Sequence, residues 1–306
     1  MTITPAMIKE LREQTGAGFG DVKNALTEAE GNMEQAIVIL RKKGLAAAGK
    51  KAGRVTAEGT IAARVDGSVG VLVEVNCETD FVGRNEIFQK FAAEVAGAIA
   101  QSRATSVEEF LAENWPGTDE PVSQKVAERI AAIKENISIR RFARYEAPKS
   151  AKIGTYIHGG GKIGVMVEVL AENCEGGTAV DEIAKDVDMH IAAAEPRFLR
   201  REDVTQKDLD TEREIARDAA AKSGKPENIV EKMVSGKMEK FYAENCCLEQ
   251  AYIKDDKLTV SKYLESRGKA TGCTYSVTRF TRYKLGEGIE KKSEDFAAEV
   301  ASYIKQ

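Results

Sequence analysis

The feature that most constrains the fold of this chain is an internal repeat. Residues 59–75 reappear at residues 154–169: both stretches begin with Gly-Thr and end in Gly-Val-x-Val-Glu-Val. A second match lies far downstream, where residues 138–145 correspond to residues 276–283 and both stretches end in Arg-Phe-x-Arg-Tyr. Self-similarity over such lengths is typical of one structural unit that is used twice. We therefore expect two similar subdomains.

Each copy of the repeat has the pattern of a β-β-α-α-β unit. It opens with a hairpin, which turns at Asp66-Gly67 in the first copy and at Gly159-Gly160-Gly161 in the second. Two helical patterns and a closing strand follow. This order predicts a small antiparallel sheet with helices on one face, which is an α+β fold. We assign residues 59–147 to the first core subdomain, and residues 148–195 with 246–288 to the second.

Residues 1–45 predict a separate three-helix domain, similar to ubiquitin-associated domains. Apolar residues recur there at helical spacing in three short stretches, which are broken at Thr15-Gly16-Ala17-Gly18 and at Gly31. A unit this small buries little core of its own, so it is either a binding module or a helical cap on the main body. Residues 46–58 are rich in Gly, Ala and Lys without an apolar period, and predict a flexible linker.

An insertion at residues 196–245 interrupts the second copy. It has the pattern of two helices, 203–222 and 226–244, joined by Ser223-Gly224-Lys225-Pro226, where glycine ends one helix and proline begins the next. The first helix is charged along most of its length, so the pair predicts an antiparallel helical hairpin that projects from the core. Its surface is a candidate for partner binding or for self-association.

The last segment, residues 289–306, predicts a C-terminal helical module. Phe296, Val300 and Ile304 stand four residues apart among charged residues, which is the spacing of an amphipathic helix. Its apolar stripe would dock either on the chain itself or on a partner.

The composition narrows the classes of partner. Lys and Arg number 45 and Asp and Glu 49, for a formal net charge of -4, whereas a general nucleic-acid binder is strongly basic. No run of about 18 apolar residues predicts a membrane span. The start of the chain lacks the pattern of a signal peptide, and the five cysteines are odd in number and lack Cys-x-x-Cys spacing. We expect a cytoplasmic protein with reduced cysteines, no metal and no cofactor.

The motifs of enzymes are missing as well. Gly159-Gly160-Gly161-Lys162-Ile163 is superficially similar to a phosphate-binding loop, but Tyr156 stands where the first glycine is required and no Ser or Thr follows the lysine. His158 has no Ser or Cys nucleophile nearby in the sequence, and Gly-x-Ser-x-Gly does not occur. We expect neither bond-making chemistry nor direct nucleotide binding.

One stretch is out of keeping with a purely structural turn. The strand that ends near Cys77 is followed by Thr79-Asp80-Phe81-Val82, an acid beside a large aromatic on a strand-to-helix loop. Loops on a rigid scaffold commonly carry function. The second copy continues from Val169 as Leu170-Ala171-Glu172-Asn173-Cys174, without an aromatic residue. The fold therefore does not require this pair, which makes it a candidate functional site.

Taken together, these motifs resemble the family of bacterial translation elongation factor Ts. The resemblance covers the chain in order and is carried by Thr15-Gly16-Ala17-Gly18, Glu74–Val82, Ser223-Gly224-Lys225-Pro226 and Gly286–Lys291. It implies a guanine-nucleotide exchange factor, which binds elongation factor Tu in its GDP-bound and nucleotide-free forms and promotes GDP release. Its Thr-Asp-Phe-Val motif is highly specific.

The resemblance also implies a mechanism and a set of contacts. Asp80 and Phe81 would insert near the nucleotide site of the partner and disturb its Mg²⁺, with Phe81 as the apolar wedge and Thr79 and Val82 beside it. Mg²⁺ requires nearly ideal octahedral geometry, so small displacements of its ligands weaken nucleotide binding. Further contacts carried over from the family are Arg12, Phe19, Lys23, His158, Ile253 and Lys254.

A function of another class remains open on the residues alone. A non-enzymatic adaptor or RNA-associated protein could use the N-terminal helices and the Arg-bearing strands at 138–145 and 276–283. These strands mix arginine with aromatics but lack the Gly-aromatic-Gly pattern of RNA-binding platforms. Binding that persists at about 200 mM salt would favour this alternative, because non-specific phosphate contacts weaken steeply there.

Overall fold

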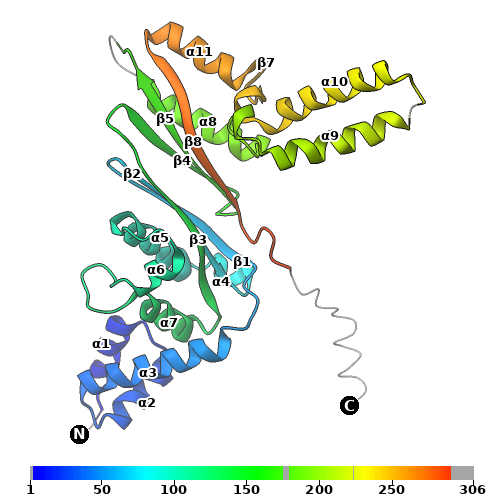
Figure 1. The fold of residues 1–306 in the computed structure, drawn as a ribbon. Coiled ribbons are helices and arrows are strands. Elements are labelled where there is room, and N and C mark those ends of the chain that lie inside the picture. Colours follow the sequence, from blue (N-terminus) through cyan, green and yellow to red (C-terminus); the bar gives the residue numbers. More distant parts are fainter. Residues whose placement is uncertain (1–2, 175–178, 223, 291–306) are drawn as a thin grey trace.

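The computed structural model describes residues 3–174, 179–222 and 224–290. Over these residues the chain forms eleven α-helices and three antiparallel sheets (Figure 1). The mixed α and β content with small antiparallel sheets agrees with the predicted class. Of the predicted C-terminal module at 289–306, everything after residue 290 lies outside the described residues.

The N-terminal end of the chain is helical, as predicted. It comprises α1 (Pro5–Thr15), α2 (Phe19–Glu28) and α3 (Met33–Lys51). Thr4 caps α1 by accepting the N–H of Met7, and Gly16 ends the helix in the left-handed conformation at a φ of 65°. The three helices enclose a small apolar cluster of their own, whose fully buried members are Leu11, Val22, Ala25, Leu26 and Ala36.

The prediction of a flexible linker at residues 46–58 is wrong for its first half, because α3 continues to Lys51. Two causes account for the difference. Residues 45–52 are mostly Leu, Ala and Lys, which are strong helix formers. In addition, α3 packs along α7 (Val122–Ile133), where Gly44 is buried and Lys51 Nζ donates to the carbonyl oxygen of Lys134. Tertiary contact thus extends a helix that has no apolar period at this point.

The first copy of the repeat forms a three-stranded antiparallel sheet in the order β1-β2-β3. Its elements are β1 (Glu58–Asp66), β2 (Val69–Cys77), α4 (Asp80–Gly83), α5 (Glu86–Gln101), α6 (Val107–Ala112), α7 and β3 (Ile137–Glu146). β2 is the central strand and is buried along nearly its whole length. The helices cover one face of the sheet, around a core centred on Val73, Val75, Phe88, Phe91 and Val95. Helices α4 and α6 were not predicted, since each is shorter than two full turns.

The second copy repeats this arrangement with the strand order β4-β5-β8. Its elements are β4 (Ala151–His158), β5 (Ile163–Glu172), α8 (Val180–Ala194), the small hairpin β6 (Ala251–Tyr252) and β7 (Asp255–Thr259), α11 (Val260–Thr271) and β8 (Thr274–Lys284). The ladders of the two copies shift register at matching points, between Glu74 and Val75 and between Glu168 and Val169. The duplication read from the sequence is therefore a duplication of structure down to a β-bulge.

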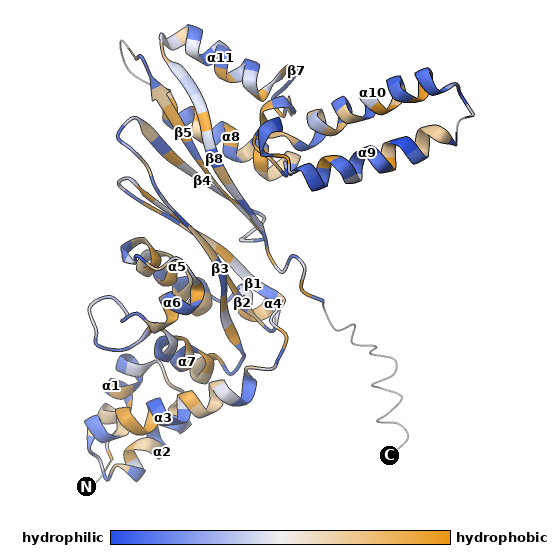
Figure 2. Ribbon diagram, in the orientation of Figure 1, coloured by the Kyte–Doolittle hydropathy of each residue, from blue (hydrophilic) through white to orange (hydrophobic). Residues whose placement is uncertain are grey.

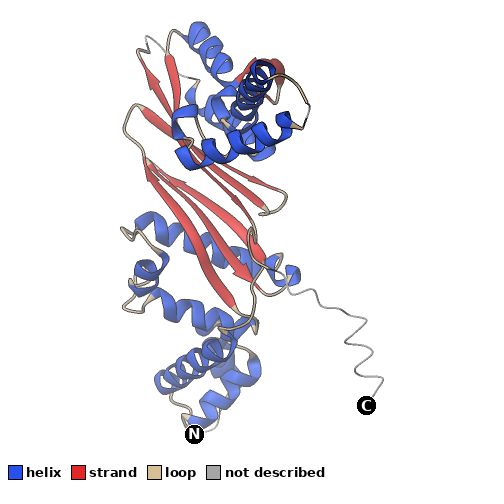
Figure 3. Cartoon of the chain, turned by 45° about the vertical axis from the view of Figure 1, so that its right-hand side comes forward, coloured by secondary structure: helices blue, strands red, loops and turns tan. Residues whose placement is uncertain are grey.

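The two sheets pack face to face, with the helices on the outer sides (Figure 3). Between them lies a shared apolar layer, which contains Ile61, Leu72, Tyr145, Ile153 and Met166. Glycine is required at the closest approach in each copy. A Cβ built on Gly70 would lie 2.5 Å from Ile153, and one built on Gly164 would lie 2.4 Å from Ile61. The two sheets meet along strands that are equivalent in the repeat.

The insertion in the second copy is a helical hairpin of α9 (Gln206–Ala221) and α10 (Glu227–Asn245), which extends away from the sheets (Figure 1). Its base includes two short 3-10 turns, Arg201–Asp203 and Cys247–Glu249. Hydrophilic residues dominate α9 (Figure 2). A small cluster that includes Ala216, Ala220, Val234, Met238 and Phe241 joins the two helices.

One covalent feature differs from the reduced cysteines expected from the sequence. Cys174, just after β5, forms a disulfide with Cys273, just before β8, across 99 residues of sequence. Cys77, Cys246 and Cys247 are free and buried. Burial raises the pKa of Cys77 to about 12, with a further contribution from the nearby Glu135 carboxylate. The sequence did not reveal this bond, because the two cysteines lie 99 residues apart and only the folded second copy brings them together.

Within the described residues, no helix is long and apolar enough to cross a membrane.

Candidate functional site

The Thr79–Val82 stretch forms the start of α4, a single helical turn between β2 and α5. Thr79 is its N-cap: the backbone is extended, with φ -123° and ψ 154°, and the hydroxyl oxygen accepts the N–H of Val82. Phe81 points away from the core and is 84% exposed, the most exposed large apolar side chain among the described residues. Because this aromatic ring is not buried, it does not stabilise the fold through the hydrophobic effect.

The inner side of this turn is fixed by close backbone packing. Val82 packs partly buried against the core of the first copy. Gly83 is buried, and a Cβ built on it would lie 2.9 Å from the carbonyl oxygen of Gly59 at the start of β1. Gln89 of α5 donates from Nε2 to the carbonyl oxygen of Gly83. The turn therefore lies flat on the sheet edge and presents Phe81 outward.

Two glutamates tie the entry of the turn to the loop between α7 and β3. Glu135 Oε2 accepts the backbone N–H groups of Glu78 and Thr79, each at 3.0 Å, and its Oε1 accepts the Thr79 hydroxyl at 2.6 Å. In return, Glu78 Oε1 accepts the backbone N–H of Asn136 at 2.6 Å. Arg54 pairs with Glu78 from the outside, at 3.2 Å. A glutamate of each segment thus accepts backbone N–H groups of the other segment.

Asp80 is half-exposed beside Phe81. Its carboxylate forms an ion pair with Arg84, one helical turn later, at 3.0 Å between Oδ2 and Nη2. Because Arg84 is 74% exposed, this pair contributes little to stability and can be exchanged for another partner.

A second apolar surface lies at the junction with the N-terminal helices. A groove there is lined by residues that include Pro5, Ile8, Arg12, Phe19 and Ile87. Phe19 is 56% exposed and Ile87, in the first turn of α5, is 57% exposed. The structure therefore brings Arg12 and Phe19 together, and adds Ile87, which the sequence analysis missed. Lys23 lies exposed on α2 and is not part of the groove.

His158 stands at the end of β4, next to the turn of the second hairpin, and is exposed. Its Nδ1 lies 3.0 Å from the Tyr156 hydroxyl. The same turn reaches the first copy, where the N–H of Ile61 donates to the carbonyl oxygen of Gly161 at 2.8 Å. Thr60, the neighbour of Ile61, lies 3.4 Å from the Gln89 side chain that holds α4. The tip of the second hairpin and α4 thus meet the same part of β1.

Ile253 and Lys254 form the turn of the β6–β7 hairpin, which packs against α11 and stands apart from α4 (Figure 1). Ile253 is 45% exposed, and Lys254 Nζ lies 2.5 Å from Asp186 Oδ1 on α8. The fully buried His190 positions this turn, because its Nδ1 accepts the N–H of Ile253 while its Nε2 lies 3.0 Å from Gln250 Oε1. Burial lowers the pKa of His190, which keeps the ring neutral for this role.

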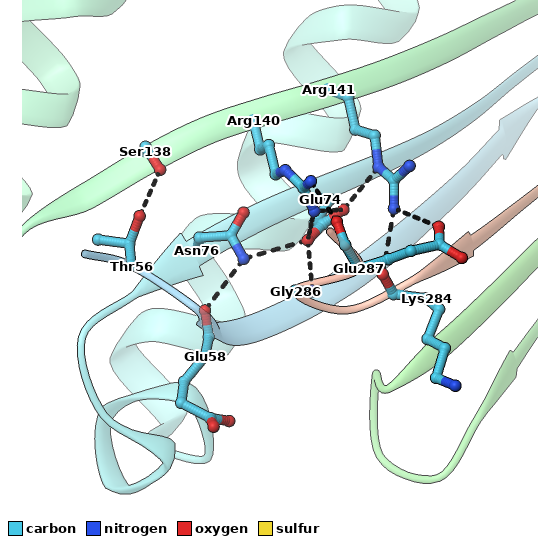
Figure 4. A network of polar contacts seen from close by, with 10 residues as sticks. All are labelled: Thr56, Glu58, Glu74, Asn76, Ser138, Arg140, Arg141, Lys284, Gly286 and Glu287. Carbon is cyan, nitrogen blue, oxygen red and sulfur yellow. Dashed lines mark hydrogen bonds and ion pairs between the residues drawn. The ribbon is translucent and has the colours of Figure 1, made fainter. Parts of the chain in front are cut away.

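The chain that leaves β8 returns to the first copy. Gly286 donates its N–H to the buried Glu74 at 2.8 Å, and the same carboxylate accepts hydrogen bonds from Asn76, Arg140 and Arg141 (Figure 4). Burial by itself would raise the pKa of Glu74, but the bonds from Gly286, Arg141, Asn76 and Arg140 outweigh it and lower the pKa. This network fastens Gly286-Glu287-Gly288 beside the start of β1.

The arginines of the closing strands are occupied by their own chain. Arg141 stacks on Tyr283 with 4.3 Å between the guanidinium carbon and the ring centre, and Arg279 stacks on Tyr145 at 4.1 Å. The first also binds Glu74, and the second binds Glu168 at 2.8 Å. These residues join the two sheets, so the strands do not offer the free basic platform that an RNA-binding alternative needs. Among the described residues, no cluster of three or more His, Cys, Asp or Glu side chains has the arrangement of a metal site.

Comparison with known proteins agrees with the resemblance of the motifs. The family model described as Elongation factor TS matches residues 78–287. Elongation factor Ts of Syntrophotalea carbinolica is 49% identical over 306 residues, with 100% of both chains covered. Those of Clostridium perfringens strain SM101 and of Magnetococcus marinus are 52% and 45% identical, covering 98% and 100% of both chains. The chain belongs to the elongation factor Ts family.

Proposed function

We propose that this protein is a guanine-nucleotide exchange factor for elongation factor Tu, and that α4 carries its working tip. The observation on which this rests is Phe81: a phenyl ring 84% exposed on a helical turn whose backbone is held from both sides. A rigid, exposed aromatic side chain is a typical anchor for a partner, because it buries a large apolar area at a small cost in conformational entropy.

In the proposed mechanism Phe81 enters an apolar space between helices of the GTPase near its nucleotide. Asp80 leaves its exposed pair with Arg84 and binds a polar group of the partner, which fixes the depth of insertion. The resulting shift displaces the Mg²⁺ that bridges the phosphates to the GTPase, and GDP is released. Factor and nucleotide then weaken each other's binding reciprocally, typically by about 1–3 kcal/mol. No covalent bond is made or broken, so the protein is not an enzyme in the ordinary sense.

The other proposed contacts extend the interface in two directions. On one side, the groove with Arg12, Phe19 and Ile87 lies between the N-terminal helices and α5, the helix that follows α4, and Lys23 is exposed on α2. On the second copy, His158 lies beside the same part of β1, and Ile253 and Lys254 present a separate patch. We propose that these surfaces bind the GTPase body while α4 acts at the nucleotide site.

The domain bounds follow the repeat and the insertion. We propose an N-terminal helical domain, whose third helix extends past the predicted bound at residue 45 to Lys51, and core subdomains of residues 59–147 and of 148–195 with 246–288. The hairpin insertion spans residues 196–245 and is the proposed self-association surface. Action on a translation factor implies a cytoplasmic location, and no nucleotide, membrane or nucleic acid is proposed as a direct partner.

The decisive experiment follows the release of a fluorescent GDP analogue from elongation factor Tu with excess unlabelled GDP. Catalytic amounts of this protein are expected to accelerate release in proportion to its concentration until saturation. Release at the uncatalysed rate would show the proposal to be wrong. In a parallel filter-binding assay with structured RNA at about 200 mM salt, persistent binding would support the adaptor alternative instead.

A further inference from the structure

The carboxylate of Glu135 makes more hydrogen bonds to the α4 entry than any other described side chain. It accepts two backbone N–H groups and one hydroxyl, from Glu78 and Thr79, at 2.6–3.0 Å. The Thr79 hydroxyl that donates to Glu135 also caps α4, since its oxygen accepts the N–H of Val82 at 3.3 Å. A continuous chain of hydrogen bonds thus runs from Glu135 through Thr79 into the turn that carries Phe81.

A turn of this length needs such support. Helix nucleation is unfavourable, and α4 spans only Asp80–Gly83, so its own hydrogen bonds cannot hold it. Hydrogen bonds to an ionised acceptor are about twice as strong as neutral ones. The two backbone donors at Glu78 and Thr79 would otherwise be left without a partner at a part-buried site. Glu135 therefore selects one orientation of the turn.

The second copy shows that the scaffold itself does not need a glutamate at this place. Aligning the closing strands places Cys273 at the position of Glu135, and aligning β2 with β5 places Cys174 at the position of Asp80. There the two segments are joined by the Cys174–Cys273 disulfide. Both copies tie the end of the central strand to the start of the closing strand. Only the first does so with a group, Glu135, that also holds the capping residue of an exposed helical turn, Thr79.

We infer that Glu135 is a positioning residue for nucleotide exchange, which acts by holding Thr79 and hence the orientation of Phe81. The inference rests on the proposed function. Loss of the carboxylate frees α4 to sample other orientations while the remaining contact surfaces stay intact. The factor then still docks on the GTPase, but a smaller fraction of docked complexes inserts Phe81. The maximal rate of release falls and the half-saturating concentration stays nearly constant.

The test is a double-mutant cycle on GDP release from elongation factor Tu, with Glu135→Gln, Phe81→Ala and both changes together. Glu135→Gln keeps the size of the side chain and loses the charge. We expect the maximal rate to fall about tenfold, which corresponds to the loss of one charge-assisted hydrogen bond. The half-saturating concentration should stay within about twofold. In the Phe81→Ala background, Glu135→Gln should have no further effect, because Glu135 acts through Phe81.

Controls separate positioning from general stability. Glu249→Gln is the matched variant, since Glu249 is likewise a glutamate whose carboxylate is bound by its own chain, in this case by Arg201, but it lies at the base of the hairpin. It should exchange like the wild type. Amide hydrogen exchange should accelerate at Thr79 and Val82 in Glu135→Gln, with thermal unfolding nearly unchanged.

Three results would overturn the inference. The first is a Glu135→Gln variant that exchanges at the wild-type rate. The second is a double variant in which Glu135→Gln slows Phe81→Ala by the same factor as it slows the wild type, which would indicate a purely structural role. The third is unchanged amide exchange at Thr79. If the wild-type chain itself fails to accelerate GDP release, the proposed function is wrong and the role of Glu135 in exchange is wrong with it. Failure of the proposed function can be told apart from failure of the inference about Glu135, because the wild-type protein alone reveals it.

Discussion

The two copies of the repeat share a scaffold and differ at its ends. Both have a buried glutamate at the bulge of the central strand, Glu74 and Glu168, and both lay an arginine across a tyrosine of the other copy. The ends of their central strands diverge: one continues into α4 and the other into Cys174. Symmetric contacts at the centre therefore preserve the architecture, while the ends are free to specialise.

The glutamates themselves show how the copies compensate for local differences. Glu74 accepts the N–H of Gly286, but the equivalent position after β3 is Pro148, which has no N–H to donate. Glu168 instead accepts the hydroxyl of Thr278 at 2.6 Å, and Thr278 occupies the place of Arg140. Both carboxylates are satisfied: Glu74 accepts from two arginines, the Asn76 side chain and a backbone N–H, and Glu168 accepts from one arginine and a hydroxyl.

The largest effect is expected from the feature that the second copy lacks. Phe81→Ala should reduce exchange on elongation factor Tu at least about 30-fold, since a central anchor residue contributes roughly 2–4 kcal/mol. Because the ring is 84% exposed, the free energy of unfolding should change by less than about 0.5 kcal/mol. Stopped-flow release of fluorescent GDP and urea denaturation measure the two quantities. Ile215→Ala, an exposed apolar residue on α9, is the control, and equal exchange by both variants would refute the wedge assignment.

The disulfide of the second copy should show the opposite behaviour. Cys273→Ser removes a bond that closes 99 residues of chain and should lower the free energy of unfolding by about 2–4 kcal/mol without reductant. Exchange should remain within about twofold of the wild type, since α4 is untouched. With reductant present, the two proteins should unfold at the same urea concentration. Identical unfolding without reductant would mean that the bond does not form in solution.

A smaller effect should distinguish the two buried glutamates. Glu74→Gln should lower the free energy of unfolding by roughly 1–3 kcal/mol at neutral pH, and more than Glu168→Gln, because two arginines lose their partner rather than one. The folded-state pKa of Glu74 is lowered, so the carboxylate's contribution is complete above its unfolded pKa of about 4.3. The gap between wild type and Glu74→Gln should shrink as the pH falls through the lower, folded-state pKa. Urea unfolding from pH 3 to 7 tests this, and a gap that widens in acid would contradict it.

The sequence predicted those parts of the molecule that depend on local pattern. The hairpins, the closing strands and α9 and α10 follow from periodicity and turn residues, and the asymmetry between the copies singled out Asp80 and Phe81. What it missed depends on segments that meet only in the fold. Glu135 acts on residues 56 and 57 positions earlier, and the disulfide joins residues 99 apart. The extension of α3 to Lys51 likewise depends on its contact with α7.

The contact between Gly286 and Glu74 has a consequence for biosynthesis. It joins residues 212 positions apart, so the last ligand of a carboxylate in the first copy is translated only when the second copy is almost complete. At a translation rate of about 5–20 residues per second, Glu74 lacks the hydrogen bond from Gly286 for at least about ten seconds after it has been synthesised. Until then Arg141 also lacks Tyr283 and Arg279 has not yet been made. The native contacts of the first copy are therefore complete only after the closing strand of the second copy has been synthesised.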